Sequence, residues 1–599
     1  MRIIGLNLTL TSEGIHLDDG ACALLEDDHF TAGIPEERLS RRKYSGGVRH
    51  ALHYCLSSRG LKLEDIDVFA VSICCDTVPS RKIAQKLLEA QGVCLPTDKI
   101  EVCPSHHLSH AASAYFSSPY EEAIILVADN EGSILGDRLY PNYSDNSLER
   151  TTLYTGTKNK IELLRRFNQG PGELSLGATY GYFTRWIGHH DYHAAGKVMA
   201  LAAYGDGDLR GACLHRFEDG NLKCFFRPLK VSRQYRSQSA SSHGSPANIC
   251  ERNDLDRAEF TNFVFSEAVR EFFFSAIGVD IGERRTSCEH PDHMQREVAW
   301  LVQKETEKAL VNLVLWAIDE TGIRNVCLAG GVGLNCVANQ RIATLPKVSG
   351  LYIQPAASDW GQAIGNALWY YHSQNGGRRI PQITDCFLGR VYSEEDICQC
   401  LEKEKSRVYF CKCDDVSKVA ATEVAAGRII GWFMEGAEFG PRALGHRSII
   451  GDPRTERTKE RLDSEIKLRE GYRPYAPSVM QEYAREWFDI SEDLLRKAFY
   501  PMQFMLLAPR VKAEKAVMVP AITCVDGSSR VHIVKRDADG LFHSLIAEFN
   551  RITGVPLVLN TSFNVAGAPI VESVGDALEA FHSMHLDLLV IGPYVVRRR

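Results

Sequence analysis

The sequence predicts an α/β protein with more than one domain, and three observations support this class. Short apolar runs bounded by turn residues predict buried strands at 3–8, 69–73, 123–128, 325–329 and 350–354. Longer stretches with helical periodicity, such as 303–318, separate some of these strands, and this mixture is typical of α/β layers. The length of 599 residues is too great for one hydrophobic core, so we expect roughly two to four domains.

The composition excludes several classes of protein. With 44% apolar and 24% charged residues, the chain is neither disordered, collagen-like nor a small disulfide scaffold. The net charge of −7 gives no general attraction to nucleic acid or to anionic membranes, and no apolar run is long enough to span a bilayer. We therefore expect no nucleic-acid and no membrane partner. Scattered cysteines and a start without a signal-peptide pattern predict a cytoplasmic protein.

Two polar segments indicate how the chain is organised. The segment 232–254 is rich in serine and other polar residues, buries little apolar surface and is predicted to be a surface insertion. A second polar stretch, 372–381, is punctuated by glycine and proline, and we place the main domain boundary there. The predicted domains are 1–375, with an insertion at about 206–300, and 382–599.

A histidine motif is the first candidate for chemistry. The run His-His-Leu-Ser-His-Ala-Ala predicts a helix on which His106 and His110, four residues apart, share one face and can reach one cation. Asp129 follows a predicted strand at the edge where α/β proteins bind ligands, and Asp359 lies at another turn. Such a donor set suits iron, manganese, zinc or magnesium. From these residues alone, a metal site and a structural turn remain alternatives.

A glycine turn is the second candidate. Gly330, Gly331 and Gly333 follow a predicted strand, and glycines there allow backbone N–H groups to approach a nucleotide closely. The spacing matches neither the Rossmann fingerprint nor the P-loop. Lys197 lies in an apolar segment, Gly-Lys-Val-Met-Ala-Leu, where a surface lysine and an anion-binding lysine are equally compatible with the sequence.

The C-terminal part carries two cation-rich motifs. The first, Glu-Phe-Gly-Pro-Arg-Ala-Leu-Gly-His-Arg-Ser, places Arg442 and Arg447 around a Gly-Pro turn. The second, Ile-Lys-Leu-Arg-Glu-Gly-Tyr-Arg-Pro-Tyr-Ala-Pro, sets Lys467 and Arg473 among aromatic residues and prolines. A flexible solvated basic face does not require these rigid turns. The pattern therefore favours bidentate recognition of phosphate or carboxylate.

Taken together, these motifs resemble the O-carbamoyltransferases of the nodulation and antibiotic type, the family of the tobramycin and cephamycin carbamoyltransferases. The shared motifs include HHxxHAAxAY, GKVMxLAxYG, AGGVxLN, EFGPRALGxRS and IKxREGYRPYAPSV. They are collinear and cover nearly the whole chain, with the weakest resemblance in 206–300 and 480–520. The resemblance implies a duplicated actin-like ATPase domain, similar to the tRNA threonylcarbamoyl-transfer enzymes, followed by a YrdC-like α/β domain.

The resemblance also implies an activity. Carbamoyl phosphate and ATP would yield carbamoyl adenylate in the C-terminal domain, and the N-terminal domain would transfer the carbamoyl group to a hydroxyl of a small natural-product acceptor, as in antibiotic or secondary-metabolite biosynthesis. The implied cofactors are ATP and a divalent metal, iron or magnesium or manganese. The sequence leaves open whether the chain forms a homodimer.

Particular residues receive roles by the same resemblance. The metal would be held by His106, His110, Asp129 and Asp359. Arg442, Lys467 and Arg473 would act in catalysis on carbamoyl phosphate and ATP. The cofactor-binding residues would be Lys197, Gly330, Gly331, Gly333, Asn335, Arg447, Arg530, Asn560, Ser562 and Asn564.

The N-terminal turn departs from the family pattern. The family usually carries there a histidine thought to act as general base toward the acceptor hydroxyl, whereas this chain has Asp18, with His16 two residues earlier. Either His16 or Asp18 acts as the base, or the acceptor needs none; Lys43, downstream, is a further catalytic candidate. Two other functions remain: threonylcarbamoyl transfer to tRNA, which the acidic balance disfavours, and a nucleotide-binding regulator with a degenerate site.

Overall fold

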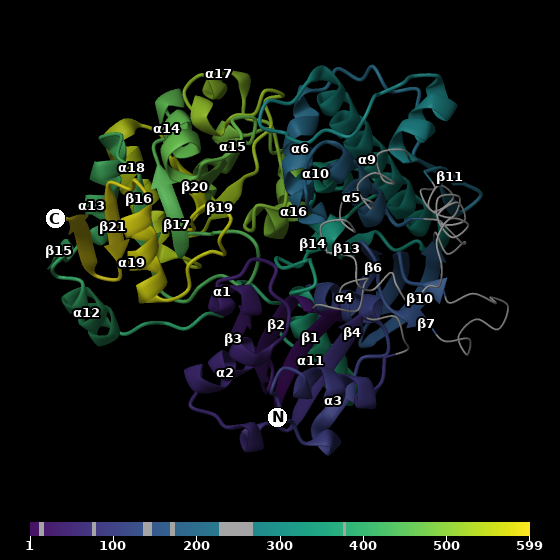
Figure 1. Cartoon of the computed structure of the whole chain (residues 1–599), viewed down its shortest axis with the longest axis horizontal. Helices are drawn as coiled ribbons and strands as arrows, with labels where there is room; N and C mark the ends of the chain where they lie inside the picture. Colours follow the sequence, from purple (N-terminus) through teal and green to yellow (C-terminus); the bar gives the residue numbers. More distant parts are fainter. Residues whose placement is uncertain (11–16, 75–78, 136–146, 168–173, 227–267, 375–378) are drawn as a thin grey trace, which may run out of the picture.

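The computed structural model describes the chain except residues 11–16, 75–78, 136–146, 168–173, 227–267 and 375–378 (Figure 1). His16 and the predicted surface segment 232–254 lie outside the described residues. Within the described part, three large sheets organise the molecule, two in the N-terminal half and one in the C-terminal part. The α/β class predicted from the sequence is therefore confirmed.

The first sheet has a β1 strand at its centre. Its strands are β1 (Arg2–Leu10), β2 (Leu17–Glu26), β3 (His29–Pro35), β4 (Val68–Cys74) and β5 (Ile100–Val102). The order is β3-β2-β1-β4-β5. β1 runs antiparallel to β2 and parallel to β4. In the β1–β2 register, Thr9 lies opposite Asp18, which fixes where the carboxyl end of β1 meets the N-terminal turn.

The second sheet repeats the first. Its strands are β6 (Glu122–Ala128), β9 (Thr151–Thr157), β10 (Lys160–Phe167), β13 (Asn325–Ala329) and β14 (Gly350–Ile353). The order β10-β9-β6-β13-β14 has the same sequence of antiparallel and parallel pairings as the first sheet. This recurrence confirms the predicted duplication of the actin-like domain. The strands expected from apolar runs are also all present.

Helices and short hairpins surround these two sheets. The helices are α1 (Glu36–Ser40), α2 (Arg49–Ser58), α3 (Arg81–Glu89), α4 (His106–Tyr115), α5 (Leu176–Trp186), α6 (Ala195–Leu201), α9 (His293–Thr321), α10 (Cys336–Ala343) and α11 (Gly361–Gln374). The hairpins pair β7 (Ile134–Leu135) with β8 (Ser147–Leu148), and β11 (His215–Glu218) with β12 (Asn221–Cys224).

One helix begins inside the predicted insertion, and another continues into the predicted domain boundary. The predicted insertion reaches residue 300, but α9 already begins at His293, and its Val298 and Ala299 are buried. At the predicted boundary, α11 continues to Gln374, and His372 is buried with its ring stacked on Phe116 at 3.9 Å. One face of each helix is buried, although polar residues lie beside the buried ones in the sequence. The exact domain limits stay a prediction.

The C-terminal part forms one mixed eight-stranded sheet, the α/β domain expected from the resemblance to the YrdC fold. Its order is β15 (Val408–Lys412), β22 (Tyr594–Arg598), β21 (Leu588–Ile591), β16 (Ile430–Phe433), β17 (Arg447–Gly451), β20 (Leu557–Ser562), β18 (Ala476–Met480), β19 (His532–Val534). The helices are α12 (Glu394–Lys403), α13 (Val416–Ala425), α14 (Glu456–Arg461), α15 (Ala484–Trp487), α16 (Glu492–Met502), α17 (Ala513–Ala516), α18 (Gly540–Thr553) and α19 (Val574–Ser583).

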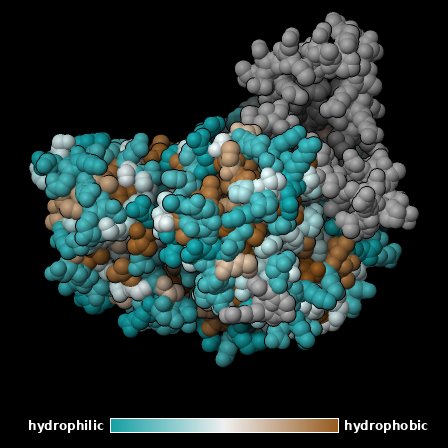
Figure 2. All heavy atoms as spheres, turned by 90° about the horizontal axis from the view of Figure 1, so that it is seen from below, coloured by the Kyte–Doolittle hydropathy of each residue, from teal (hydrophilic) through white to brown (hydrophobic). Residues whose placement is uncertain are grey.

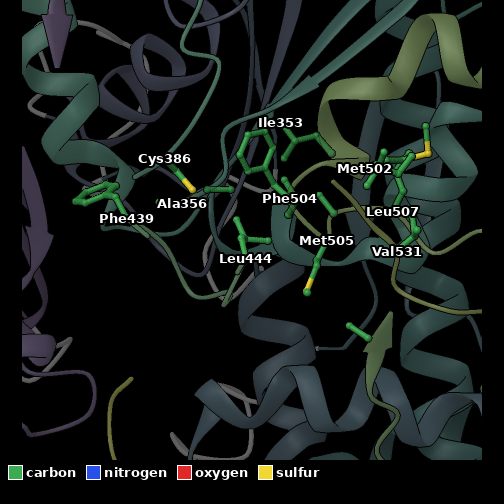
Figure 3. Packing of buried hydrophobic residues seen from close by; sticks show 14 of the residues in the cluster. Ile353, Ala356, Cys386, Phe439, Leu444, Met502, Phe504, Met505, Leu507 and Val531 are labelled. Carbon is green, nitrogen blue, oxygen red and sulfur yellow. The ribbon is translucent and has the colours of Figure 1, made fainter. Parts of the chain in front are cut away.

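The hydrophobic core continues from one part of the chain into the other. Figure 3 shows Ile353, the last residue of β14, and Ala356, which follows it, near Leu444, Met502 and Phe504 of the C-terminal part. Because α16 packs on β14, buried apolar contacts rather than a flexible linker set the relative position of the sheets. Polar groups reinforce the contact.

Two such polar contacts are well defined. The Tyr352 and Tyr500 hydroxyls lie 3.1 Å apart, and their rings stack, which joins β14 to α16. The Arg38 guanidinium donates to the Gly440 carbonyl oxygen at 2.8 Å, which brings α1 against the loop that carries the first cation-rich motif.

The exposed surface is mainly hydrophilic on the face shown in Figure 2, with apolar residues scattered among polar ones. Among the described residues, the helices are all too short or too polar to cross a membrane.

The packing of α11 against α4 depends on a glycine, and this generates a stability prediction. A Cβ at Gly365 would lie 2.1 Å from the Ser109 carbonyl oxygen, so Gly365→Ala must force the two helices apart. We expect a loss of about 1–3 kcal/mol in the free energy of unfolding, measured by urea denaturation. The matched control is Gly540→Ala at the start of α18, where an added Cβ meets no atom within 4 Å. Equal stability of the two variants would contradict this account.

Candidate functional site

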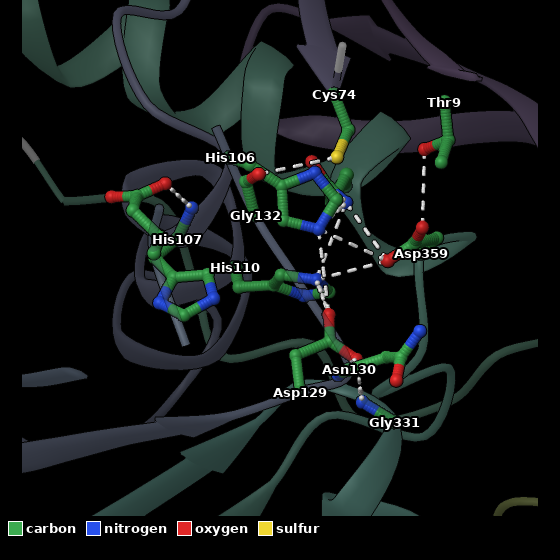
Figure 4. Close-up of polar contacts among 12 residues, drawn as sticks. Thr9, Cys74, His106, His107, His110, Asp129, Asn130, Gly132, Gly331 and Asp359 are labelled. Carbon is green, nitrogen blue, oxygen red and sulfur yellow. Dashed lines mark hydrogen bonds and ion pairs between the residues drawn. The ribbon is translucent and has the colours of Figure 1, made fainter. Parts of the chain in front are cut away.

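The histidines of α4 converge with two aspartates from other elements. Ser105 caps the helix by accepting from the Leu108 N–H at 3.0 Å, and the helix then presents both imidazoles to one side (Figure 4). His110 Nε2 lies 2.9 Å from Asp129 Oδ2 and 3.1 Å from Asp359 Oδ1. His106 Nε2 lies 3.4 Å and 3.3 Å from the same two oxygens. The four residues implied as metal ligands are thus brought together.

This cluster has the chemistry of a metal site. One ligand atom from each of the four residues lies within 4.8 Å of the other three. Two imidazole nitrogens and two carboxylate oxygens form a donor set suited to first-row divalent metals or magnesium. Other groups hold the carboxylates in place: Asp129 Oδ1 accepts from the Gly331 N–H at 3.0 Å, and Asp359 Oδ2 accepts from Thr9 Oγ1 at 3.1 Å. The residues present therefore fit a bound divalent cation.

The two carboxylates of the cluster change the pKa values of the histidines that face them. Burial opposes a charge on His106, but Asp359 and Asp129 outweigh burial and raise the pKa of His106 to about 10. The neighbouring His107 is different, because burial lowers its pKa to about 4 and its Nδ1 lies 2.7 Å from Thr152 Oγ1. The carboxylates thus favour a positive charge beside them, and His106 and His110 must lose their protons before a metal ion can bind.

The glycine turn links the histidine cluster to α10. Gly330 has φ of +87°, and a Cβ there would lie 2.3 Å from the Ala128 carbonyl oxygen, so only glycine fits. The amides of Gly331 and Gly333 are used within the protein, by Asp129 and by the Gly330 carbonyl. Asn335 caps α10 by accepting from the Ala338 N–H at 3.1 Å. In this structure the turn positions Asp129 and α10, and its nucleotide role stays a prediction.

Arginines of the C-terminal part gather over the start of α10. Arg442 and Arg530 lie within electrostatic reach of each other and of Cys336, the first residue of α10. Burial, and next the charge of Arg530, lower the pKa of Arg442 to about 9. The Nε atoms of Arg442 and Arg530 are buried and find no hydrogen-bond partner in the described part of the chain. Buried guanidinium nitrogens without partners, on side chains that are half-buried, favour a site for an anion.

A second group of predicted residues forms a closed polar network at the end of β20. Lys467 Nζ lies 2.7 Å from Asn564 Oδ1 and 2.9 Å from the Ser562 carbonyl oxygen. Burial, and then nearby arginines, lower the pKa of Lys467 well below its usual range. Asn560 donates to the Ala443 carbonyl oxygen at 3.1 Å, which ties β20 to the Arg442 loop. Lys467 therefore orients Ser562 and Asn564 here.

Arg447 occupies a structural position in β17. Its side chain is fully buried, stacks on the Phe433 ring at 3.7 Å, and donates to the Glu435 carbonyl oxygen at 3.1 Å. Glu438 shapes the loop that carries Arg442, because the Glu438 Oε1 accepts from the N–H groups of Leu444 and His446 at 2.6 and 3.0 Å. The loop that presents Arg442 is thus fixed from both ends.

Three further cations lie where the N-terminal half meets the C-terminal part. Lys43, Lys197 and Arg473 are within electrostatic reach of one another. Arg473 in turn lies within reach of Arg442. Lys197 Nζ forms an ion pair with Glu470 Oε1 at 2.8 Å, so the two motifs that contain them meet across the domain contact. The structure therefore joins the predicted cations into one positively charged region.

The N-terminal turn contains residues that the sequence patterns did not single out. Asp18 accepts from the Tyr192 hydroxyl at 2.9 Å, and His193 Nε2 lies 3.5 Å from Asp18 and 3.7 Å from Asp19. Burial raises the pKa of Asp19 to about 7. The His193 ring stacks on Tyr44 at 3.7 Å. No local motif signals this cluster, because more than 170 residues separate Asp18 and Asp19 from Tyr192 and His193 in the sequence.

Models of known protein families match most of this sequence. Residues 11–92 and 78–368 match the model described as Carbamoyltransferase N-terminus, and residues 421–598 match Carbamoyltransferase C-terminus. The chain belongs to the carbamoyltransferase family. It is therefore an enzyme that transfers carbamoyl groups, as the resemblance of its motifs predicted.

Named relatives agree with the assignment of this carbamoyltransferase. Nodulation protein NolNO of Sinorhizobium fredii is 31% identical over 97% of this chain and 79% of its own length. Nodulation protein NolO of Bradyrhizobium diazoefficiens is 31% identical over 83% of this chain and 79% of its own. Among solved structures, HypF of T. kodakarensis overlaps 63% of this chain and 48% of its own at 13% identity, with a TM-score of 0.32. A structural overlap of that size carries no argument about activity.

The four-residue cluster generates a metal-binding prediction. We expect Mn²⁺ or Fe²⁺ to raise the melting temperature of the protein, because an ion that binds the folded chain stabilises it. Asp359→Asn should raise the dissociation constant, measured by calorimetry, at least about tenfold, since even outer partners of ligands contribute that much. Affinity should rise with pH between about 6 and 9, because the imidazoles must lose protons to bind.

The control for this experiment is His293→Gln. His293 belongs to a separate, exposed group of Asp206, His293 and Glu297 that also brings metal-binding atoms together. The variant His293→Gln should leave the affinity of the protein for Mn²⁺ or Fe²⁺ unchanged. Tight binding that survives Asp359→Asn but is lost in His293→Gln would place the metal at that other group and refute the assignment.

Proposed function

We propose that this carbamoyltransferase makes carbamoyl adenylate from carbamoyl phosphate and ATP, and then transfers the carbamoyl group to a hydroxyl of a small acceptor. In the first stage, water releases phosphate from carbamoyl phosphate and leaves carbamate. A carbamate oxygen then attacks the α-phosphorus of ATP, and the bond to pyrophosphate breaks. In the second stage the acceptor oxygen attacks the carbamoyl carbon, AMP leaves, and the hydroxyl proton passes to a base.

The observation that carries the proposal is the excess of half-buried positive charge around Arg442. Arg530 and Arg473 lie within electrostatic reach of Arg442 and, after burial, lower its pKa. Burial and next the charge of Arg469 lower the pKa of Arg473, and the same two causes lower the pKa of Arg530. Such a cluster is unfavourable until anions fill it, and a charge-assisted hydrogen bond contributes about 1.5–3 kcal/mol. Carbamoyl phosphate and the triphosphate of ATP are the polyanions that the first stage requires.

The chemistry of this stage depends on positioning and charge neutralisation. Phosphoryl transfer offers the protein little covalent chemistry, so guanidinium groups that neutralise the developing charge provide most of the acceleration. Arg442 sits on a loop fixed by Glu438 and by the Asn560 contact to Ala443, which keeps its guanidinium in place. Lys467, Ser562 and Asn564 line the neighbouring strand end.

The second stage belongs to the histidine and aspartate cluster of the N-terminal half. A divalent cation bound there would supply Lewis-acid charge beside the carbamoyl and phosphate oxygens. Thr9 donates to Asp359 and lies opposite Asp18 in the β1–β2 register, so the cluster and the N-terminal turn adjoin. Asp18, with His193 beside it, is placed to accept the hydroxyl proton. Tyr192 and His193 both contact the Asp18 carboxylate and keep it oriented.

Arg442→Ala should abolish pyrophosphate release. The intact enzyme should release pyrophosphate only when ATP and carbamoyl phosphate are both present, and loss of one oxyanion-type contact typically costs about 10²–10³ in rate. A coupled phosphate assay after pyrophosphatase treatment, with phosphate from carbamoyl phosphate subtracted, gives the rate. The control Arg536→Ala removes an exposed guanidinium far from the cluster. Wild-type pyrophosphate release by Arg442→Ala would end the proposal.

Asp18→Asn should separate the two stages. The variant should still make pyrophosphate, because Asp18 lies at the start of β2 in the N-terminal half, but it should carbamoylate hydroxyl acceptors about 10²–10⁴-fold more slowly. Candidate polyols are incubated with the enzyme, and products that gain one carbamoyl group are counted by mass spectrometry. If transfer by Asp18→Asn equals that of the intact enzyme, Asp18 is not the base.

A further inference from the structure

Gln362 lies among the proposed metal ligands, although the resemblance of the motifs assigns it no role. It is the second residue of α11, three positions after Asp359, and its N–H donates to the Asp359 carbonyl oxygen at 3.0 Å. The residue is fully buried. The Ser109 hydroxyl donates to the Gln362 carbonyl oxygen at 3.3 Å, which ties this turn of α11 to α4. Gln362 is therefore held firmly beside the two histidines of α4.

The side-chain amide of Gln362 contacts three of the four proposed ligand atoms, which belong to His106, His110 and Asp359 (Figure 4). Its Nε2 lies 3.1 Å from His106 Nε2, 3.2 Å from His110 Nε2 and 3.1 Å from Asp359 Oδ1. It also lies 3.2 Å from His106 Nδ1. An amide nitrogen carries only two hydrogens, so it cannot donate to all four atoms at once. Hydrogen bonds from this nitrogen therefore account for only part of the arrangement.

The spacing of these atoms is that of neighbouring ligands on one metal ion. Ligand atoms of an octahedral Mg²⁺ site lie about 2.0–2.1 Å from the ion, so adjacent ligand atoms are about 3 Å apart. The contacts between the histidine nitrogens and the aspartate oxygens of the cluster range from 2.9 to 3.4 Å. The contacts of the Gln362 amide fall within that range. The amide thus occupies a place where a fifth ligand would lie.

The amide oxygen of Gln362 supports the same role. Oε1 is buried and has no hydrogen-bond partner among the described residues. A buried oxygen without a partner is unfavourable. A half-turn about the Cγ–Cδ bond exchanges the oxygen and the nitrogen, which brings Oε1 to the histidines and Asp359. There the oxygen can coordinate a cation through its lone pairs, whereas the nitrogen is only a donor of hydrogen bonds.

We propose that Gln362 coordinates the divalent cation through Oε1, and that this fifth ligand contributes more to the binding of Mn²⁺ than to that of Zn²⁺. Zn²⁺ is satisfied by four ligands in tetrahedral geometry, whereas Mn²⁺ suits an octahedral site rich in oxygen. Two imidazoles, two carboxylates and one amide leave one octahedral position for an oxygen of water or substrate. The inference rests on the metal site of the proposed function and is independent of the reaction.

The first experiment titrates Mn²⁺ and Zn²⁺ separately into the full chain by isothermal titration calorimetry. Gln362→Leu removes the oxygen and keeps a buried side chain. It should raise the dissociation constant of Mn²⁺ at least about tenfold, and that of Zn²⁺ by less than about threefold. Gln374→Leu is the matched control, because it makes the same change at an exposed position at the other end of α11. It should leave both constants unchanged.

Gln362→Glu tests the same position without removing the oxygen. A glutamate offers an oxygen in the same place, so this variant should bind Mn²⁺ at least as tightly as the intact chain does. A side chain that only positioned Asp359 by donating to it would give a different result. In that case Gln362→Leu would weaken Mn²⁺ and Zn²⁺ binding to the same extent, because both ions use Asp359.

A crystal structure of the intact chain with Mn²⁺ gives the direct measurement. Gln362 Oε1 should lie within about 2.5 Å of the ion, as an oxygen ligand does. Three results overturn the proposal: an ion whose ligands do not include Oε1, an Mn²⁺ dissociation constant unchanged in Gln362→Leu, and equal weakening of Mn²⁺ and Zn²⁺ binding. The structure also decides the question if Gln362→Leu fails to fold.

Failure of the proposed function would be distinguishable from failure of this inference. If the intact chain binds neither ion at the cluster, the metal site and the role of Gln362 are both wrong. If Mn²⁺ binds equally well without the Gln362 oxygen, only the role of Gln362 is lost. If Gln362 coordinates Mn²⁺ but the enzyme releases no pyrophosphate from ATP and carbamoyl phosphate, the ligand stands and the proposed reaction is wrong.

Discussion

Repulsion between half-buried cations is the constraint on which the architecture depends. Arg442 is held within electrostatic reach of both Arg530 and Arg473, whose charges disfavour its own. The free energy that holds them comes from elsewhere, from the core that runs across both halves and from contacts such as Tyr352 with Tyr500. The two halves therefore need an extensive apolar contact, because a loosely hinged pair of domains would separate these charges.

The same contact explains how two distant clusters become parts of one enzyme. The glycine turn after β13 is bound to Asp129 on one side and continues into α10 on the other. Cys336, at the start of α10, lies within reach of Arg442, and Asn339 one turn later donates to the Leu506 carbonyl oxygen at 3.1 Å. A short rigid segment thus connects the carboxylates that fit a metal with the guanidinium groups that fit phosphate.

Local sequence patterns predicted the parts of this arrangement that are built from neighbouring residues. His106 and His110 need only helical spacing to share a face, and the strands are visible as apolar runs. The sequence could not reveal the pairing of Lys197 with Glu470 or of Asp18 with His193, because these contacts arise only when distant elements pack. The predicted insertion to about 300 and the predicted boundary from 372 also cut into α9 and α11, whose buried faces become evident only when the chain is folded.

The carboxylates near Lys43, Lys197 and Arg473 determine what these cations can do. Glu470 bridges Lys197 of the N-terminal half and Arg473 of the C-terminal part. Glu37 and Asp191 lie within electrostatic reach of Lys43. Without these carboxylates the free protein would carry the full repulsion of the three cations. The ion pairs therefore help to hold the two halves together, whereas Arg442 and Arg530, whose Nε atoms find no hydrogen-bond partner in the described part of the chain, are left to meet an anion.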